Sequence, residues 1–252
     1  MAQGGNISIP VFVLHVKKGY EERARHIDRM MERLGIEFEY FLDGDMEDIT
    51  PERLERYFSG PAATVRPATS VALKHLLIFE KMIAVDIPYA LIFEDDIFLK
   101  DNFTKIFDKS LEQVRELTSG PERPFIVSYE ATCLKLVPRS QRRKGKVIYP
   151  ADMLQCMGAY LVNNAFAKAI VGKTVEMKCA EPSDIWIDRL GHEYGLYDLY
   201  WTHPITAEQG SHNGRMATSL GNPLSDQGSS LRSIRIKRKL SMWYKKLLYF
   251  FR

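Results

Sequence analysis

Hydrophobic runs without polar alternation recur along the first 130 residues, separated by segments with helical spacing of apolar positions. The runs at 9–16, 89–99 and 125–129 are too short for helices, and each predicts a buried strand. A further strand is expected at 37–42. Helices are expected between the strands, over 21–34, from Thr50 onward, over 70–84 and over 103–117. Strands alternating with helices predict an α/β domain with a mostly parallel sheet.

Three adjacent carboxylates, Glu94, Asp95 and Asp96, lie between the two apolar halves of the 89–99 run. Ligands of α/β sheets bind at the carboxyl ends of strands, which is where we expect these acids. Clustered negative charges beside buried hydrophobes are commonly neutralised by a cation. Carboxylates suit Mg²⁺ or Mn²⁺, and these ions keep positions open for phosphate oxygens. The triplet therefore predicts a divalent-metal site for a nucleotide phosphate, and the alternative is a solvated acidic turn.

The composition is that of an ordinary globular protein, with 252 residues, 45% hydrophobic and 27% charged. No apolar window reaches about 18 residues, and the first residues do not form a secretory signal. Cys133, Cys156 and Cys179 are widely spaced and odd in number, which predicts neither a disulfide framework nor a zinc site. Free thiols in a reducing cytosol are the expected state.

Charge is distributed unevenly behind a formal net value of +3. From Ser229 to the end there are eight Lys or Arg and no acid, so the preceding residues carry 27 basic and 32 acidic side chains. This predicts three parts: an acidic body over 1–220, a linker over 221–230 and a basic tail over 231–252.

The tail has apolar and aromatic residues at mostly helical spacing with cations between them, a pattern typical of an interfacial helix. Anionic headgroups would attract the cations by about 1 kcal/mol each, while aromatic residues such as Trp243 enter the headgroup boundary. We therefore predict peripheral attachment to the inner face of the cytoplasmic membrane, with no nucleic-acid partner. The alternative is that the helix packs on the body or on a partner subunit.

Several segments, taken in order, resemble glycosyltransferase family 25, the lipooligosaccharide and lipopolysaccharide galactosyltransferases related to collagen galactosyltransferases. They are Val13–Arg23, Ser70–Leu76, Ala90–Asp96, Gly158–Val162, Pro182–Trp186 and Pro204–Gln209. Two departures stand out: Ser70-Val71 replaces the family's Gly-Cys pair, and Lys74-His75 replaces its Ser-His pair. His75 is kept, with a supporting role or direct catalysis left open.

The resemblance implies a GT-A-like fold and an inverting, metal-dependent transfer from a nucleotide sugar, with UDP-galactose as the leading donor. It implies that Asp96 ligates the metal and that Glu94 and Asp95 contact the ribose or metal-bound water. Gln209 is expected near the donor or acceptor, and Arg23 near the nucleotide or its phosphates. The expected acceptor is a lipid-linked or cell-surface glycan.

Inverting transfer needs a general base opposite the leaving group, and we predict Asp184 for this role. Glu181 and Asp188 are the reserve candidates, and an N-cap role for Asp184 is the alternative. Trp186 is expected to form an apolar or stacking wall for a sugar ring. Either His203 or His212 is a candidate to complete the metal site.

Two other functions fit parts of the sequence. A sugar-phosphate nucleotidyltransferase would also use acids at a strand end, but it should have a Gly-rich loop after the first strand, which Lys17–Tyr20 does not provide. A non-catalytic membrane-associated assembly protein would make the tail its function, yet it would have no physical reason to retain clustered acids beside the core.

Overall fold

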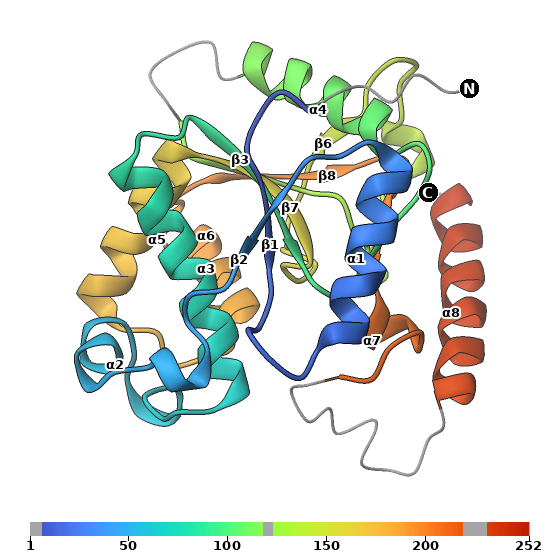
Figure 1. The fold of residues 1–252 in the computed structure, drawn as a ribbon. Helices are drawn as coiled ribbons and strands as arrows, with labels where there is room; N and C mark the ends of the chain where they lie inside the picture. Colours follow the sequence, from blue (N-terminus) through green and yellow to red (C-terminus); the bar gives the residue numbers. More distant parts are fainter. Residues whose placement is uncertain (1–6, 118–122, 219–230, 252) are drawn as a thin grey trace.

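The computed structural model describes residues 7–117, 123–218 and 231–251, and a seven-stranded sheet lies at its centre (Figure 1). The strand order is β2-β1-β3-β7-β5-β8-β6. The strands are β1 (Val11–Leu14), β2 (Glu39–Phe41), β3 (Tyr89–Glu94), β5 (Phe125–Ser128), β6 (Ile148–Pro150), β7 (Ala159–Asn163) and β8 (Asp198–Thr202). Only β6 and β7 run antiparallel to their neighbours. The predicted α/β class with a mostly parallel sheet is confirmed.

Helices cover both faces of the sheet, which makes three layers (Figure 1). One face packs against α2 (Pro51–Tyr57), α3 (Pro67–Ala84), α5 (Asn164–Met177) and α6 (Ser183–Tyr194). The other face packs against α1 (Glu21–Leu34) and α4 (Phe103–Leu117). Each face therefore has its own hydrophobic core.

Strand β3 explains why the central strands have no polar alternation. Ala90 and Ile92 point into the core beneath α3 and α5, whereas Leu91 and Phe93 point into the core beneath α1 and α4. All four are fully buried. Successive side chains alternate between faces, and since both faces are covered, every position must be apolar.

The acidic triplet divides the 89–99 run into two strands. β3 ends at Glu94, the chain turns at Asp95 and Asp96, and β4 (Ile97–Leu99) then pairs with β9 (Ala207–Gln209) in a separate two-stranded sheet. The second apolar half thus anchors a late segment of the chain beside the acids. This pairing brings Gln209 to the end of β3.

Helix boundaries follow local signals closely. α1 and α4 have the predicted bounds, and Thr50 caps α2 by accepting a hydrogen bond from the Arg53 N–H. α3 begins at Pro67, earlier than expected, because proline is well suited to the first helical position.

Strands β1, β3, β5 and β8 run in the same direction, so their carboxyl ends meet at one edge of the sheet. The residues that follow these strands are polar: His15 after β1, the acids after β3, Glu130 shortly after β5 and His203 after β8. The short helix α7 (Gly210–Asn213) follows β9 at the same edge. This edge carries the candidate site.

The C-terminal helix α8 (Leu231–Phe251) packs beside the body and lies near α7 (Figure 1). Arg238 donates hydrogen bonds to the carbonyls of Ala131 and Thr132, and Tyr249 is buried. The packing alternative for the tail is thus correct for one side of the helix. The predicted linker at 221–230 lies outside the described residues, among which no helix is long and apolar enough to cross a membrane.

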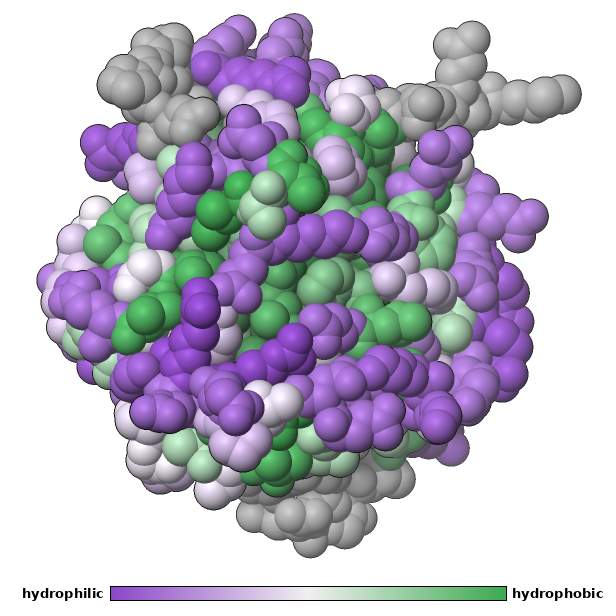
Figure 2. Space-filling view, turned by 60° about the vertical axis from the view of Figure 1, so that its left-hand side comes forward, coloured by the Kyte–Doolittle hydropathy of each residue, from purple (hydrophilic) through white to green (hydrophobic). Residues whose placement is uncertain are grey.

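The other side of α8 is exposed and apolar. Ile236, Leu240, Trp243, Leu247 and Phe251 follow one another at spacings of three or four residues, and each is exposed. Among the described residues, α8 carries nine of the sixteen large hydrophobic side chains that are exposed. By contrast, hydrophilic residues interrupt the hydrophobic ones across the face shown in Figure 2.

Candidate active site at the sheet edge

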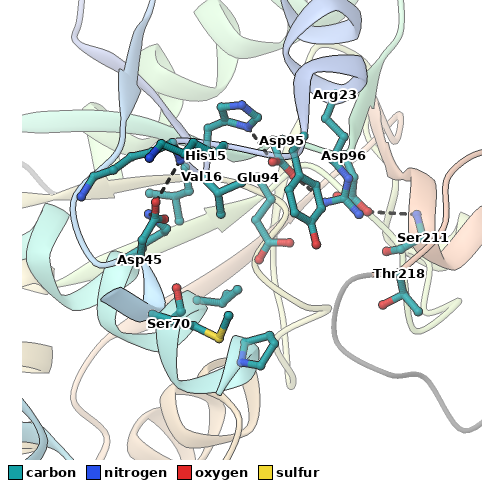
Figure 3. A pocket seen from close by; sticks show the side chains of 18 of the residues that line it. His15, Val16, Arg23, Asp45, Ser70, Glu94, Asp95, Asp96, Ser211 and Thr218 are labelled. Atoms are coloured by element: carbon teal, nitrogen blue, oxygen red, sulfur yellow. Dashed lines mark hydrogen bonds and ion pairs between the residues drawn. The ribbon is translucent and has the colours of Figure 1, made fainter. Parts of the chain in front are cut away.

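A pocket of about 410 Å³ opens at the carboxyl ends of β1 and β3 (Figure 3). The acidic triplet forms one side, the loop after β1 and the first turn of α1 form a second, and the start of α3 forms a third. Four predicted site residues, Arg23, Glu94, Asp95 and Asp96, all line it. These four residues therefore lie around one pocket, and their functional roles stay predictions.

Asp95 is fixed by two cationic or hydrogen-bonding partners. His15 Nδ1 lies 2.7 Å from one carboxylate oxygen, and Arg23 donates to the other at 2.6 Å. Arg23 also donates to the carbonyl of Ala217, which ties the segment after α7 to α1. Both oxygens of Asp95 are therefore occupied within the chain.

Glu94 is held from two sides. Gln209 donates to one of its oxygens at 2.8 Å, and the ring of His75 lies 3.4 Å from the other. His75 is fully buried and also contacts the Tyr160 hydroxyl at 2.7 Å. These contacts give His75 a supporting role, in which it orients Glu94 from beneath the pocket.

Asp96 is the member of the triplet with spare acceptor capacity. Its Oδ2 accepts the backbone N–H of Ser211 at 2.9 Å, whereas its buried Oδ1 has no hydrogen-bond partner among the described residues. Burial, followed by the charge of Glu94, raises the pKa of Asp96. Burying a carboxylate oxygen without a partner is unfavourable in free energy unless a ligand or ion binds to it.

The two departures at the start of α3 have structural partners. Lys74 is buried and pairs with Asp45 at 2.7 Å, while the Ser70 hydroxyl donates to the Gly44 carbonyl at 2.7 Å. Gly44 has φ +95°, and a Cβ there would lie 3.1 Å from the Lys74 side chain. The loop after β2 is thus shaped around Lys74.

The late histidines are not gathered around Asp96. His203 lines a second pocket, at the end of β8, and His212 is exposed on α7 immediately after Ser211. In the part of the chain that the structure describes, no three His, Cys, Asp or Glu side chains are arranged as a metal site. Their role as ligands stays a prediction, for which His212 is better placed because its neighbour contacts Asp96.

Asp184 lies in the first turn of α6, half-buried, within electrostatic range of Cys133 and Cys156. The N-cap alternative is wrong, because the cap position is Pro182 and no side-chain cap bond forms. The reserve candidates are bound elsewhere: Asp188 accepts the Leu154 N–H at 2.6 Å, and Glu181 pairs with Arg189.

The predicted sugar-stacking wall at Trp186 is wrong. This side chain is only 2% exposed and its indole N–H donates to the Thr174 hydroxyl, so it belongs to the core between α5 and α6. From sequence alone, an aromatic residue on an amphipathic helix can be either a stacking surface for a ligand or part of the core. Its burial in the structure decides between the two.

A family model described as glycosyltransferase family 25 (LPS biosynthesis protein) matches residues 8–187. The chain belongs to this family. Membership makes it a glycosyltransferase of lipopolysaccharide biosynthesis, with a nucleotide-sugar donor and a glycan acceptor. No curated protein matches the chain.

Two solved structures similar to this family 25 chain are themselves glycosyltransferases, each at 11% identity and a TM-score of 0.38. One is a glycosyltransferase involved in glycosylation of the major capsid of PBCV-1, covering 75% of this chain and 81% of its own. The other is mouse xyloside xylosyltransferase 1, at 77% and 84%. Likenesses this distant carry no argument about activity.

Sequence reasoning missed three residues at this sheet edge: His15 and Ser211, which line the pocket, and Glu130, which lines the neighbouring one. His15 and Glu130 each follow closely on a buried strand, so the rule that located the triplet could have found both. Ser211 contacts Asp96 through its backbone N–H and its side chain, and the sequence has no signal for a partner that comes from so far along the chain.

Proposed function

We propose that this glycosyltransferase transfers a sugar, with galactose from UDP-galactose as the leading candidate, to a hydroxyl of a lipid-linked or cell-surface glycan with inversion. The observation that carries the proposal is Asp96, whose buried Oδ1 lacks a partner beside a 410 Å³ pocket in a family 25 chain. The pocket holds basic groups from the turn after β1 on one side and carboxylates on the other, as a metal-bound nucleotide diphosphate requires.

The residues fit a divalent cation. Mg²⁺ and similar ions commonly bind through one or two carboxylates and fill the remaining positions with water and phosphate oxygens. Asp96 Oδ1 would be the direct protein ligand, and Glu94 would contact coordinated water. When bound, Mn²⁺ or Mg²⁺ would supply Lewis-acid stabilisation of the departing diphosphate.

The fixed network around the triplet orients the donor. Arg23 and His15 occupy Asp95, so this carboxylate acts mainly by positioning the turn that carries Asp96. Arg23 contributes positive charge to the pocket beside the diphosphate. Gln209, bonded to Glu94, faces the same end of β3 and would hold the sugar end of the donor.

Transfer is a single displacement in this proposal. The acceptor oxygen forms a bond to the anomeric carbon while the bond from that carbon to the diphosphate oxygen breaks, and the electron pair leaves with the nucleoside diphosphate. Asp184 would take the acceptor proton as general base. What supports this role is that Cys156 lies within electrostatic range of both Asp184 and Glu130.

The exposed apolar side of α8 supports attachment to an anionic membrane surface, with Lys and Arg flanking the stripe. Because Arg238 fixes the helix to the body, the sheet edge would be held in one orientation to the lipid-linked acceptor. The proposed location is the inner face of the cytoplasmic membrane.

The test is release of UDP from a panel of UDP-sugars with Mn²⁺, with EDTA and with Asp96→Asn. We expect one preferred donor and at least about a 100-fold loss with the variant. Asp101→Asn, which alters an exposed acid only a few residues away, is the matched control. Activity that withstands both EDTA and Asp96→Asn would contradict the metal role. A product formed instead from a sugar 1-phosphate and a nucleoside triphosphate would favour the nucleotidyltransferase alternative.

A further inference from the structure

A second pocket, of about 290 Å³, lies at the same sheet edge, where β5 and β8 end. The acidic pocket faces the ends of β1 and β3, and the two pockets are separated by the strand β7 and the residues around Glu130. None of the sequence predictions gives this second pocket a function, although His203, which was predicted as a metal ligand, lines it.

Cations surround the second pocket. Lys100 directly follows β4, Lys135 and Arg142 come from the segment between β5 and β6, and Lys246 comes from α8. Among the described residues, no carboxylate forms an ion pair with Lys135, Arg142 or Lys246. Burial lowers the pKa of Lys100, and the more distant charges of Lys246 and Arg215 add to this shift, whereas Glu208, 3.9 Å from the Lys100 ammonium, opposes it.

The one carboxyl group that lines this pocket does not offset these charges. Glu130 is buried, accepts the Gly158 N–H at 2.6 Å and contacts the Thr132 hydroxyl. Burial, with added repulsion from Glu94 and Asp96, raises the pKa of Glu130 well above its ordinary value and favours the neutral acid. The pocket therefore has a positive excess suited to an anion.

Two aromatic residues give the pocket a surface for a sugar ring. Trp201 lines it from β8 with one edge, since it is only 8% exposed and otherwise packs against Val137 and Tyr149, and its indole N–H is held by the Met153 carbonyl. Phe250 lines it from α8 and lies 4.0 Å from the guanidinium of Arg139. Apolar sugar faces pack on aromatic rings, while the cations would bind a charged substituent.

A hydrogen-bond chain connects the two pockets. Glu94 accepts from Gln209, whose amide oxygen accepts from the Thr132 hydroxyl at 3.3 Å, and Thr132 contacts Glu130. Glu94 lines the first pocket and Glu130 the second. A donor sugar beside Gln209 would thus lie next to a ligand held in the second pocket.

We propose that the second pocket binds the acceptor as an anionic saccharide, whose phosphate or carboxylate is held by Arg142 and Lys246 while its ring packs against Trp201. This inference rests on the proposed glycosyl transfer, for which it supplies the acceptor class. The packing of α8 on the body would then also contribute to acceptor binding, because Lys246 and Phe250 of α8 form part of the pocket wall.

The test compares binding of glucose 6-phosphate, glucuronate, glucose and inorganic phosphate to the full chain by calorimetry and saturation-transfer NMR. We expect both anionic sugars to bind more tightly than glucose or phosphate, and the tighter of the two identifies the charged group. Lys246→Gln should weaken binding about tenfold, the effect of one charge-assisted contact. Lys239→Gln, which removes the same charge from an exposed position on α8, should not.

Equal binding of glucose, equal binding of phosphate alone, or an equal loss with Lys239→Gln would overturn the assignment. Arg142→Gln is a second variant outside α8, and it should weaken binding even if Lys246→Gln disturbs the packing of α8. UDP release to water is measured in the same samples for the wild-type chain and for Lys239→Gln, and the two should be equal. A wild-type chain that releases no UDP from any UDP-sugar would instead overturn the proposed function and the acceptor role with it.

Discussion

A Cβ atom at Gly158 would lie 2.5 Å from Cγ of Gln209, so these two residues can meet only because one of them is glycine. The Gly158 N–H also donates to Glu130, and its carbonyl accepts the N–H of Glu94. One residue immediately before β7 thus binds the carboxylate of Glu130 and the backbone of Glu94.

Gly158→Ala should displace Gln209 and break its bond to Glu94. We expect kcat/KM for transfer to fall about 100-fold, the scale of a displacement of about 1 Å in a catalytic group. Gly172→Ala is the matched control, because Gly172 lies within α5 with no atom in the way and alanine there should stabilise the fold by about 0.5–1 kcal/mol. Equal activity of the two variants would remove Gln209 from the site.

Local patterns were sufficient for most of the fold. The bounds of α1 and α4 follow from apolar positions that recur at helical spacing, and α2 follows from the Thr50 cap. The end of the 89–99 run was not predictable locally, because β4 is defined by its pairing with β9, more than 100 residues away.

The site was predicted where its residues are contiguous and missed where they are not. The triplet could be located from a single strand. Glu130 lies at the same sheet edge only because β5 and β3 both end there, which the local sequence does not show. Trp186 was wrongly predicted to stack on a sugar, because hydrophobic periodicity does not distinguish a side chain that faces a ligand from one that faces the core.

Membrane attachment should depend on the exposed stripe of α8. Leu240→Ser and Trp243→Ser should each weaken cosedimentation with vesicles that contain anionic lipid, since each removes apolar area from the headgroup boundary. Val85→Ser is the control, because Val85 and Leu240 are each 63% exposed but Val85 lies on the body. Binding that is equally strong to neutral vesicles, or unaffected by the α8 variants, would contradict the prediction.

Cys133 should be the most reactive thiol at neutral pH. A hydrogen bond with Cys156 lowers the pKa of Cys133 to about 7, while burial raises the pKa of Cys179 to about 11. Because the thiolate is the nucleophile, alkylation by iodoacetamide should accelerate as pH rises through about 7. Peptide mass spectrometry identifies the site.

Cys156→Ala is the informative comparison for this thiol, because alanine has no hydrogen-bond donor. Loss of the donor should return the pKa of Cys133 toward its ordinary value of 9.0 and slow its alkylation at pH 7. An unchanged pH profile in Cys156→Ala would contradict the pairing of the two side chains.

The buried pair of Lys74 and Asp45 should contribute to stability far more than a surface pair does. Lys74→Met leaves Asp45 partly buried without its cation, and we expect the free energy of unfolding to fall by about 3–5 kcal/mol. Lys173→Met breaks a more exposed pair with Glu176 and should cost about 1 kcal/mol or less. Urea denaturation measures both.

The double variant Lys74→Met with Asp45→Asn separates the charge from the packing. Asparagine can still accept the Lys17 N–H that Asp45 accepts at 2.9 Å, so removing the orphaned charge should restore part of the lost stability. If the double variant is as unstable as the sum of the single variants, the two side chains are not coupled, and Lys74 stabilises the fold through the carbonyls of Leu42 and Asp43 instead.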